Sequence, residues 1–258
     1  MSDTDKGSVS KLPLGKRFLA LLQKQEERCL VATDNGLVIL GKTVPATVEH
    51  LGTVLSLLDR VGSCFWGCHG GDHVAEFIGA RCCSTARAAL RLLRHGYYDE
   101  SLSLTRSLAE AANLLFLFKT DKLAFADWRT ADHKKRRSEF SPVRVRLRLE
   151  QLGSPAPADA DRYSEYCEIG THITPAVSPQ AHGAGGIKTM GGYYQPNGAL
   201  LALNELAGML GCAAAGVASL VELPTEIRKQ LLHASVDLLR NVGGVSVHSV
   251  KGVNPPSA

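Results

Sequence analysis

Apolar residues recur at helical spacing along most of the chain, and the most strongly patterned stretch runs from Tyr97 to Phe118. At about 100° per residue, its apolar side chains cover all but a narrow strip of a helix surface. That strip, which we call the polar ribbon, holds side chains spaced alternately four and three residues apart: Asp99, Ser103, Arg106, Glu110 and Asn113. Because a helix that is apolar nearly all round is a buried one, we predict a buried central helix over residues 97–118.

The same spacing predicts helices on both sides of the central helix. They cover residues 13–29, 45–61, 72–95, 121–130, 142–152, 159–171, 198–223 and 224–242. With the abundance of Ala and Leu, they predict the all-α class, as a single helical bundle of about seven to nine helices. We expect a disordered tail over residues 1–12, one helical domain over 13–242 and a flexible tail over 243–258.

Two segments have ambiguous patterns. The turn-forming sequence ATDNG at residues 32–36 predicts the end of the first helix, and LVIL at 37–40 fits either a strand or a connector. Residues 143–149 alternate Val or Leu with Arg, which is typical of a strand. The start at Ser141-Pro142 and the stop at Gly153 favour a helix instead, and we predict a helix there.

The composition favours a reducing compartment. The 258 residues are 45% apolar, which is enough for a core, and the net charge of +4 does not by itself imply nucleic acid. Seven cysteines cannot all pair with one another, and residues 1–10 are polar and lack the apolar segment of a secretion signal. We therefore expect a cytoplasmic protein without a disulfide framework, and no motif predicts a cofactor.

One stretch resembles a membrane span. Residues 206–221 form a run of 16 residues without charge, rich in Ala and Gly, whereas a spanning helix needs about 20. Small residues also allow helices to pack closely inside a bundle. We expect a packed helix here and no membrane contact.

The charges of the polar ribbon need partners, because unpaired charge in a core is costly. Arg106 and Glu110 are one helical turn apart and can pair. The predicted helix 159–171 carries Tyr163 and Tyr166 and is followed by His172. If that helix packs on the ribbon, a site for acid–base work or anion binding forms, with the candidate catalytic residues His172, Arg106, Glu110 and Tyr166. The alternative is a structural ion pair with Tyr and His at a helix end.

The same two segments carry a resemblance to a known family. GYYDESLSLTRSLAEAANLLFLF at residues 96–118 is followed by YSEYCEIGTHITP at 163–175. The pattern resembles an uncharacterised bacterial family of all-helical proteins that is similar to HEPN-type bundles. That superfamily includes metal-independent ribonucleases of toxin and phage-defence systems. The likeness covers about residues 72–223, and it implies a helical bundle and an RNA-directed effector with no metal.

The chain also differs from the ribonuclease pattern of that superfamily. Those enzymes carry an Arg four to six residues before a His on one helix. Here the nearest Arg before His172 is Arg162, ten positions away, or about 15 Å along a helix. The resemblance therefore implies the fold more firmly than RNA cleavage.

A basic segment follows the central helix. Between residues 134 and 148 it has seven Lys and Arg against one Glu. The candidate nucleic-acid-binding residues are Lys134, Lys135, Arg136, Arg137, Arg144 and Arg148. Only Phe140 within the segment could stack on a base. The alternative is a solvated helix face.

Two weaker motifs point to a metal site and to a phosphate-binding loop. Cys64, Cys68, His69 and His73 could hold zinc, but their spacing is not that of a standard finger, and buried cysteines with ordinary histidines explain them as well. The Gly-rich segment 183–192 lacks the order of a phosphate-binding loop. We predict no metal site.

Three functions are consistent with this sequence. The first is a HEPN-like effector that acts on RNA through His172, Arg106, Glu110 and Tyr166. The second is a non-catalytic bundle that binds a protein partner or a second copy of the chain. The third is nucleic-acid binding through residues 134–148 without chemistry. They differ in what they predict for His172, which is close to the ribbon in the first and exposed and alone in the second.

Overall fold

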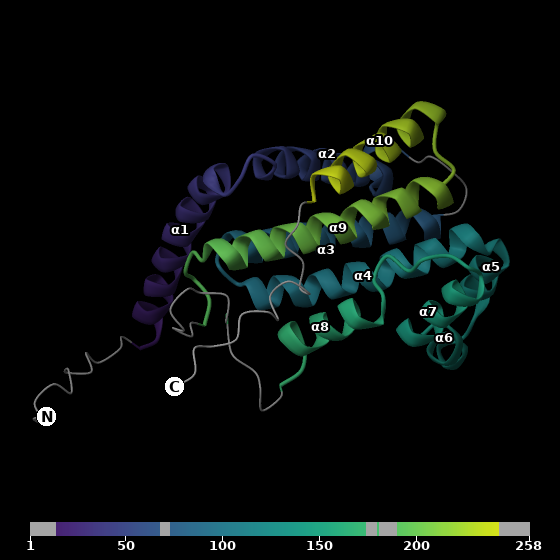
Figure 1. Ribbon diagram of the computed structural model, residues 1–258, viewed down its shortest axis with the longest axis horizontal. Helices are drawn as coiled ribbons and strands as arrows, with labels where there is room; N and C mark the ends of the chain where they lie inside the picture. The colour runs from purple at the N-terminus through teal and green to yellow at the C-terminus, as the bar shows by residue number, and fades with distance from the viewer. Residues whose placement is uncertain (1–13, 68–72, 174–179, 181–189, 243–258) are drawn as a thin grey trace, which may run out of the picture.

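The computed structural model describes residues 14–67, 73–173, 180 and 190–242. Within these ranges the chain forms ten α-helices and one short 3-10 helix (Figure 1). The all-α prediction is confirmed, and the predicted number of seven to nine helices is one too low. The bounds are α1 (Lys16–Ile39), α2 (Val44–Gly62), η1 (Cys64–Trp66), α3 (His73–Arg94), α4 (Tyr98–Thr120), α5 (Lys122–Thr130), α6 (His133–Glu139), α7 (Pro142–Gln151), α8 (Ala160–Gly170), α9 (Pro196–Leu220) and α10 (Thr225–Asn241).

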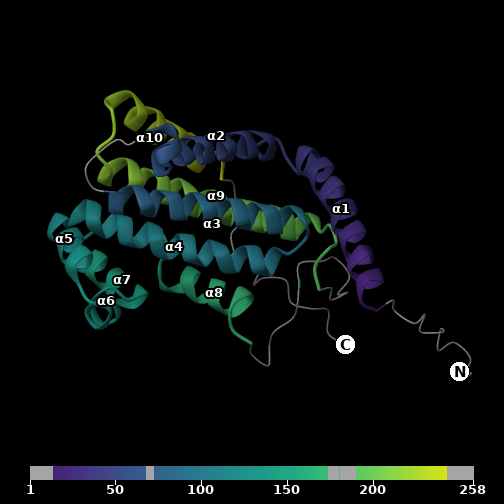
Figure 2. The ribbon, with the colours of Figure 1, turned by 180° about the vertical axis from the view of Figure 1, so that it is seen from behind.

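Helices α3, α4 and α9 pack on one another and form the centre of the bundle (Figures 1 and 2). α2 and α10 cover α3 and α9 on one side. On the other side, α8 packs along α4, and α5, α6 and α7 gather at the end of α4 where that helix finishes. The main core draws on α2, α3, α4, α9 and α10, and a second apolar cluster joins α4 to α5 and α7.

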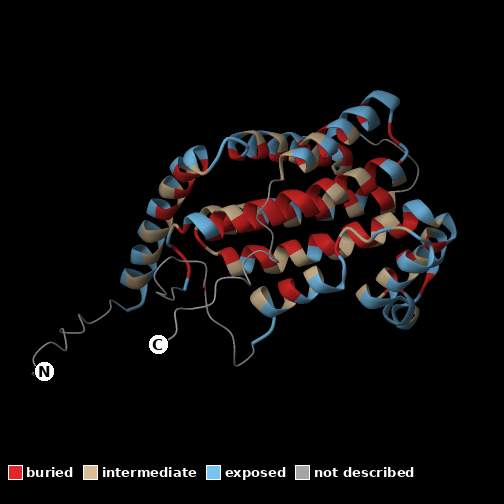
Figure 3. Cartoon of the chain, in the orientation of Figure 1, coloured by how far each residue is buried: buried red, intermediate tan, exposed pale blue. Residues whose placement is uncertain are grey.

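The helix with the apolar stretch 206–221 is α9, and it is a core helix. It is long and apolar enough to cross a membrane, but 83% of its most apolar window is buried inside the bundle (Figure 3). Its small residues allow close packing, since a Cβ at Gly216 would lie 2.6 Å from Leu115 Cβ on α4. The centre of the fold therefore comprises α9 as well as the predicted central helix α4.

The prediction that ATDNG ends the first helix is wrong. α1 continues through Asn35 and Gly36 to Ile39, so residues 37–39 form its last turn and no strand. Gly36 is buried under the ring of Tyr194, where a Cβ would lie 2.1 Å from the phenol oxygen. The glycine is thus explained by a contact with a distant segment, and this packing overrides the local turn preference.

The alternating segment 143–149 is helical, as predicted. Val145 and Leu149 are buried one turn apart, against the aromatic cluster of α4 and α5, while Val143 and Leu147 are exposed. A helix buries every third or fourth residue, so only half of the alternating apolar positions are buried. The predicted tails, residues 1–12 and 243–258, lie outside the described residues.

Candidate functional site

The polar ribbon of α4 is covered by α8, and Gly170 allows the close approach. A Cβ on Gly170 would lie 2.6 Å from the carbonyl oxygen of Asp99 and 2.8 Å from the amide nitrogen of Ser103. The next residue, Thr171, has its hydroxyl 3.5 Å from that of Ser103. The end of α8 therefore lies directly on the first turns of α4, as the packing hypothesis required.

The middle of the ribbon forms a cluster of hydrogen bonds with α8. Tyr163 accepts a hydrogen bond from Arg106 Nη2 and donates one to Glu110 Oε1 at 2.6 Å. Arg106 also pairs with Glu110 at 3.0 Å, as predicted, and its Nε donates to the sulfur of Cys167 at 3.0 Å. These side chains are partly exposed, with 26% of Arg106 and 37% of Glu110 accessible.

A second guanidinium joins this group from α7. The Arg146 Cζ lies 4.6 Å from the centroid of the Tyr163 ring, and the Arg106 Cζ lies 4.9 Å from it. Both distances are in the range of cation–π contacts. Arg146 Nη1 is buried and has no hydrogen-bond partner among the described residues. We call Arg106, Glu110, Tyr163, Cys167 and Arg146 the Arg–Tyr cluster.

The electrostatics of the Arg–Tyr cluster favour a fixed charge over proton transfer. Burial and the hydrogen bond to Glu110 raise the pKa of Tyr163 to about 12. Burial lowers the pKa of Arg106, but Glu110, Tyr163 and Cys167 together outweigh burial, so that the pKa lies above its usual value. At neutral pH the cluster therefore presents a neutral phenol beside permanent guanidinium charges, which suits anion binding better than general-base chemistry.

We expect the replacement Tyr163→Phe to remove one phenol that ionises near pH 12 from the alkaline titration of the protein's tyrosines. The unfolded phenol has a pKa of about 10, so the native pKa of about 12 gives stability that is present below pH 10 and is lost between about pH 10 and 12. Ultraviolet absorbance should show that the variant lacks one phenol that ionises near pH 12. If the phenol that the variant lacks instead ionises near pH 10, the ordinary value for tyrosine, the result would contradict the buried contact between Tyr163 and Glu110.

Asn113, the last residue of the polar ribbon along the chain, has a structural role. The Asn113 side chain donates to the carbonyl oxygen of Ala158 at 2.8 Å and accepts from its amide at 2.9 Å. Both groups are buried. This pair of bonds fixes the segment before α8, so Asn113 positions the helix and is unavailable to a ligand.

Tyr166 faces the core, away from Arg106. Its hydroxyl donates to Glu205 Oε2 on α9, and Arg162 Nε donates to the same oxygen at 2.8 Å. Only 1% of the Glu205 side chain is accessible. Burial next to this carboxylate holds the pKa of Tyr166 well above its usual value. We call Arg162, Tyr166 and Glu205 the buried triad, and it joins α8 to α9.

His172 lies just beyond the end of α8 and is exposed. Its amide donates to the carbonyl of Cys167 at 2.8 Å. Within the described part of the chain, its imidazole makes no hydrogen bond and no ion pair that would fix it. The neighbouring Thr171 contacts Ser103, so His172 directly follows the residue that lies on the first turns of α4.

The candidate nucleic-acid-binding residues gather on α6 and α7. We call Lys134, Lys135, Arg136, Arg137, Arg144 and Arg148 the basic lobe. All but Lys135 and Arg148 are exposed. Arg136 donates to the carbonyl of Ala131 at 2.6 Å, and Arg148 pairs with Asp121 at 3.0 Å. Residues 119–151 hold ten basic and five acidic side chains, so their net charge of +5 exceeds the +4 of the whole chain.

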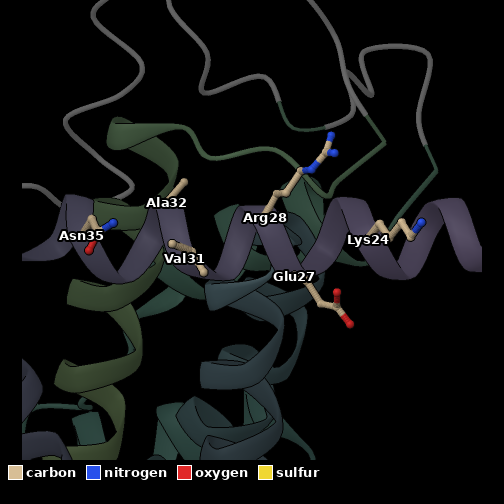
Figure 4. A pocket seen from close by; sticks show the side chains of 6 residues that line it. All are labelled: Lys24, Glu27, Arg28, Val31, Ala32 and Asn35. Atoms are coloured by element: carbon tan, nitrogen blue, oxygen red, sulfur yellow. The ribbon is translucent and has the colours of Figure 1, made fainter.

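The described residues of the candidate zinc site do not come together in the structure. Cys64 is exposed, and His73 Nδ1 lies 2.7 Å from Glu76, while Cys68 and His69 lie outside the described residues. No group of three metal-binding side chains is found among the described residues. The Gly-rich segment 183–192 is described only from residue 190 onward. A hollow of about 560 Å³ on α1 has charged side chains that point in different directions (Figure 4).

Comparison with known proteins gives one family. A family of unknown function (DUF5677) matches residues 73–153, which contain α3 to α7. The match includes Arg106, Glu110, Arg146 and the basic lobe, and it ends before Tyr163 and His172. No curated protein matches the chain, and no solved structure matches it. The match therefore carries no assigned activity.

Sequence reasoning missed four of the residues that organise this region. Cys167 and Arg146 complete the Arg–Tyr cluster, and Arg162 and Glu205 complete the buried triad. One signal was available for Glu205, because a single carboxylate within an otherwise apolar helix needs a cationic partner. For Arg146, the sequence offered no means to distinguish it from its exposed neighbour Arg144.

Proposed function

We propose that this protein binds RNA, with the basic lobe and the Arg–Tyr cluster as one continuous anion-binding surface. The observation that carries the proposal is the position of Arg146. It belongs to the same helix as Arg144 and Arg148 of the basic lobe, yet its guanidinium lies on Tyr163 within the Arg–Tyr cluster. Two regions that are distant in sequence thus share one helix, and both have a net positive charge, because Arg106 and Arg146 outnumber Glu110 in the Arg–Tyr cluster.

The physical chemistry of these residues supports a polyanionic ligand. Nucleic-acid binding depends mainly on Lys and Arg that neutralise phosphates. The basic lobe supplies exposed side chains of this kind, and the half-buried guanidinium of Arg146 adds positive charge beside them. The resemblance to HEPN-type bundles points to RNA over DNA.

Binding is tested with a fluorescently labelled RNA and the full chain, by anisotropy at several salt concentrations. We expect binding that weakens linearly in log Kd against log salt. The variant Arg146→Met should bind at least about fivefold more weakly while it keeps the stacking volume of the side chain. Absence of binding by the wild-type chain at low salt would contradict the proposal.

RNA cleavage through His172 is the second candidate function: the observation in its favour is that the neighbouring Thr171 contacts Ser103 of the ribbon, whereas the exposure of His172 is what the non-catalytic bundle predicts. Imidazole is the side chain that most often serves as a general acid or base. If His172 does so, wild-type protein should shorten total RNA and His172→Ala should not, while both bind RNA equally. Equal activity of the two proteins, or intact RNA with both, would leave RNA binding without cleavage by His172.

A further inference from the structure

The outer face of α3 carries a row of arginines that the proposed function does not use. Arg81, Arg87 and Arg91 are exposed on it. Arg87 is 68% accessible and lies 3.7 Å from Asp59, which is a weak pair at that exposure. Among the described residues, Arg81 and Arg91 have no acidic partner within ion-pair distance. This face is therefore strongly basic and available to a ligand.

A groove runs beside the second half of this row. It has a volume of about 560 Å³ and lies between α1, α2 and α3. Its basic lining residues are Arg87, Arg91, Arg94 and His95. Its apolar lining residues include Leu55 and Leu90. Arg94 is held by two hydrogen bonds to Asp34, at 2.9 and 2.5 Å, so its position is fixed. Cationic walls over an apolar floor suit a ligand with both phosphates and flat rings.

Exposed aromatic rings stand at the other end of the row. Phe65, Trp66 and Phe77 are 83%, 56% and 57% accessible. The Trp66 indole N–H donates to Asp59 at 3.0 Å, which orients the ring, and Phe65 lies edge-on to it at 5.0 Å. His73 stacks on Phe77 at 5.8 Å. Large rings exposed together mark a binding surface.

This aromatic group is at the same end of the bundle as the basic lobe. Ile78, next to Phe77, packs against the apolar cluster that holds α5 and α7 on α4. Figures 1 and 2 both show the start of α3 beside α5. The basic lobe, the aromatic group and the arginine row of α3 are therefore neighbours in that order along the molecule.

The spacing of these groups fits an extended strand. Arg81, Arg87 and Arg91 are separated by six and four residues, or about 9 and 6 Å along the helix axis, and Arg81 lies about 120° round the helix from Arg87, so a strand that contacts all three crosses the exposed face of α3 at an angle. Aromatic rings can stack only on bases that are not already paired. A duplex would present its phosphates to the arginines but would leave the rings without a partner.

We propose that the outer face of α3 is a track for single-stranded RNA, with Trp66 and Phe77 as base-stacking platforms and Arg81, Arg87 and Arg91 as phosphate contacts. This inference rests on the proposed RNA binding, and it adds the strandedness of the ligand and its path. The sequence could not suggest it, because the basic segment 134–148 contains only one aromatic residue.

The test compares a 12-nucleotide oligouridylate with an RNA hairpin duplex of equal charge, each at one salt concentration. Trp66→Ala with Phe77→Ala should weaken single-strand binding by about 10- to 100-fold and duplex binding by less than about threefold, with the salt dependence unchanged. Arg81→Ser with Arg91→Ser should instead reduce the salt dependence for the single strand. The matched control replaces two exposed apolar residues of α1, Val38→Ala and Ile39→Ala, and should bind as wild type.

A second readout uses the native Trp66 side chain and leaves every residue of the proposed track unchanged. The chain has two tryptophans, so in a Trp128→Phe background the fluorescence of Trp66 should be quenched by the single strand and unchanged by the duplex. The track would be overturned if the single strand left the Trp66 fluorescence unchanged and both double variants bound RNA as tightly as wild type. That result would leave the proposed RNA binding through the basic lobe in place. No binding of either RNA by wild type would overturn the proposed function, and an acidic peptide that competes with RNA for α3 would assign the groove to a protein partner.

Discussion

Replacing Lys134, Arg137 and Arg144 with Glu is expected to weaken RNA binding by at least about 100-fold near 0.1 M salt. All three side chains are exposed, so the change removes cations from the basic lobe without disturbing packing. The net charge of residues 119–151 falls from +5 to −1, because each replacement subtracts two. The slope of log Kd against log salt should also fall by about 2 for a single strand, since each lost phosphate contact contributes about 0.7.

The control for this variant carries the same change of net charge elsewhere. Lys16→Glu, Lys24→Glu and Lys229→Glu alter exposed residues on α1 and α10. This variant should lose less than about fivefold in affinity, through long-range repulsion alone. Equal losses in the two triple variants would mean that total charge, and not the basic lobe, governs the interaction.

The largest effect on stability is expected for Glu205→Ala. The carboxylate accepts hydrogen bonds from Tyr166 and from Arg162 Nε, and it is almost completely buried. Its removal leaves a guanidinium and a phenol between α8 and α9 without their acceptor. Breaking a buried pair in this way costs about 3 kcal/mol or more, which corresponds to a melting temperature about 10 °C lower for a protein of this size. Thermal unfolding followed by circular dichroism measures it.

Two further variants separate pairing from packing. Tyr166→Phe removes one hydrogen bond only and should cost about 1 kcal/mol. The triple change Arg162→Leu, Tyr166→Phe and Glu205→Leu removes every charge of the buried triad and should recover most of the loss, because apolar replacements of a buried ion pair are often neutral. If the Glu205→Ala protein has the same melting temperature as wild type, the buried triad does not hold α8 on α9.

Periodicity alone predicted most of the helices and the pairing on the ribbon. The four-and-three spacing of polar residues in α4 predicted a pair between Arg106 and Glu110, and the two are 3.0 Å apart. The same reasoning predicted α7 as a helix despite its alternating Val, Leu and Arg. Both predictions depend only on which residues share a face of one helix, which the sequence determines directly.

Relations between helices could not be predicted in this way. Tyr163 and Tyr166 are one turn apart on α8, yet Tyr163 bonds to Glu110 and Tyr166 to Glu205. Which ring faces which helix depends on the rotation of α8, and that rotation is set by the contact of Gly170 with α4 and by the buried carboxylate on α9. For the same reason the sequence predicts Tyr166 as a site residue, whereas in the structure Tyr163 contacts the ribbon and Tyr166 contacts Glu205.

The extent of α1 depends on tertiary packing as well. ATDNG has the composition of a turn, but the side chain that lies closest to Gly36 among the described residues belongs to Tyr194, far along the chain. The resemblance to HEPN-type bundles remains a prediction, and so does the role of His172. What the structure adds is the link through Arg146 between the basic lobe and the Arg–Tyr cluster.

The most direct test of the account is the salt dependence of RNA binding by the unmodified protein. Affinity for a labelled 12-nucleotide RNA is measured by anisotropy between 50 and 200 mM salt. With about four to six phosphates contacted, the account predicts a straight line of log Kd against log salt with a slope of about 3 to 4. A slope near zero, or no binding at 50 mM salt, would contradict it.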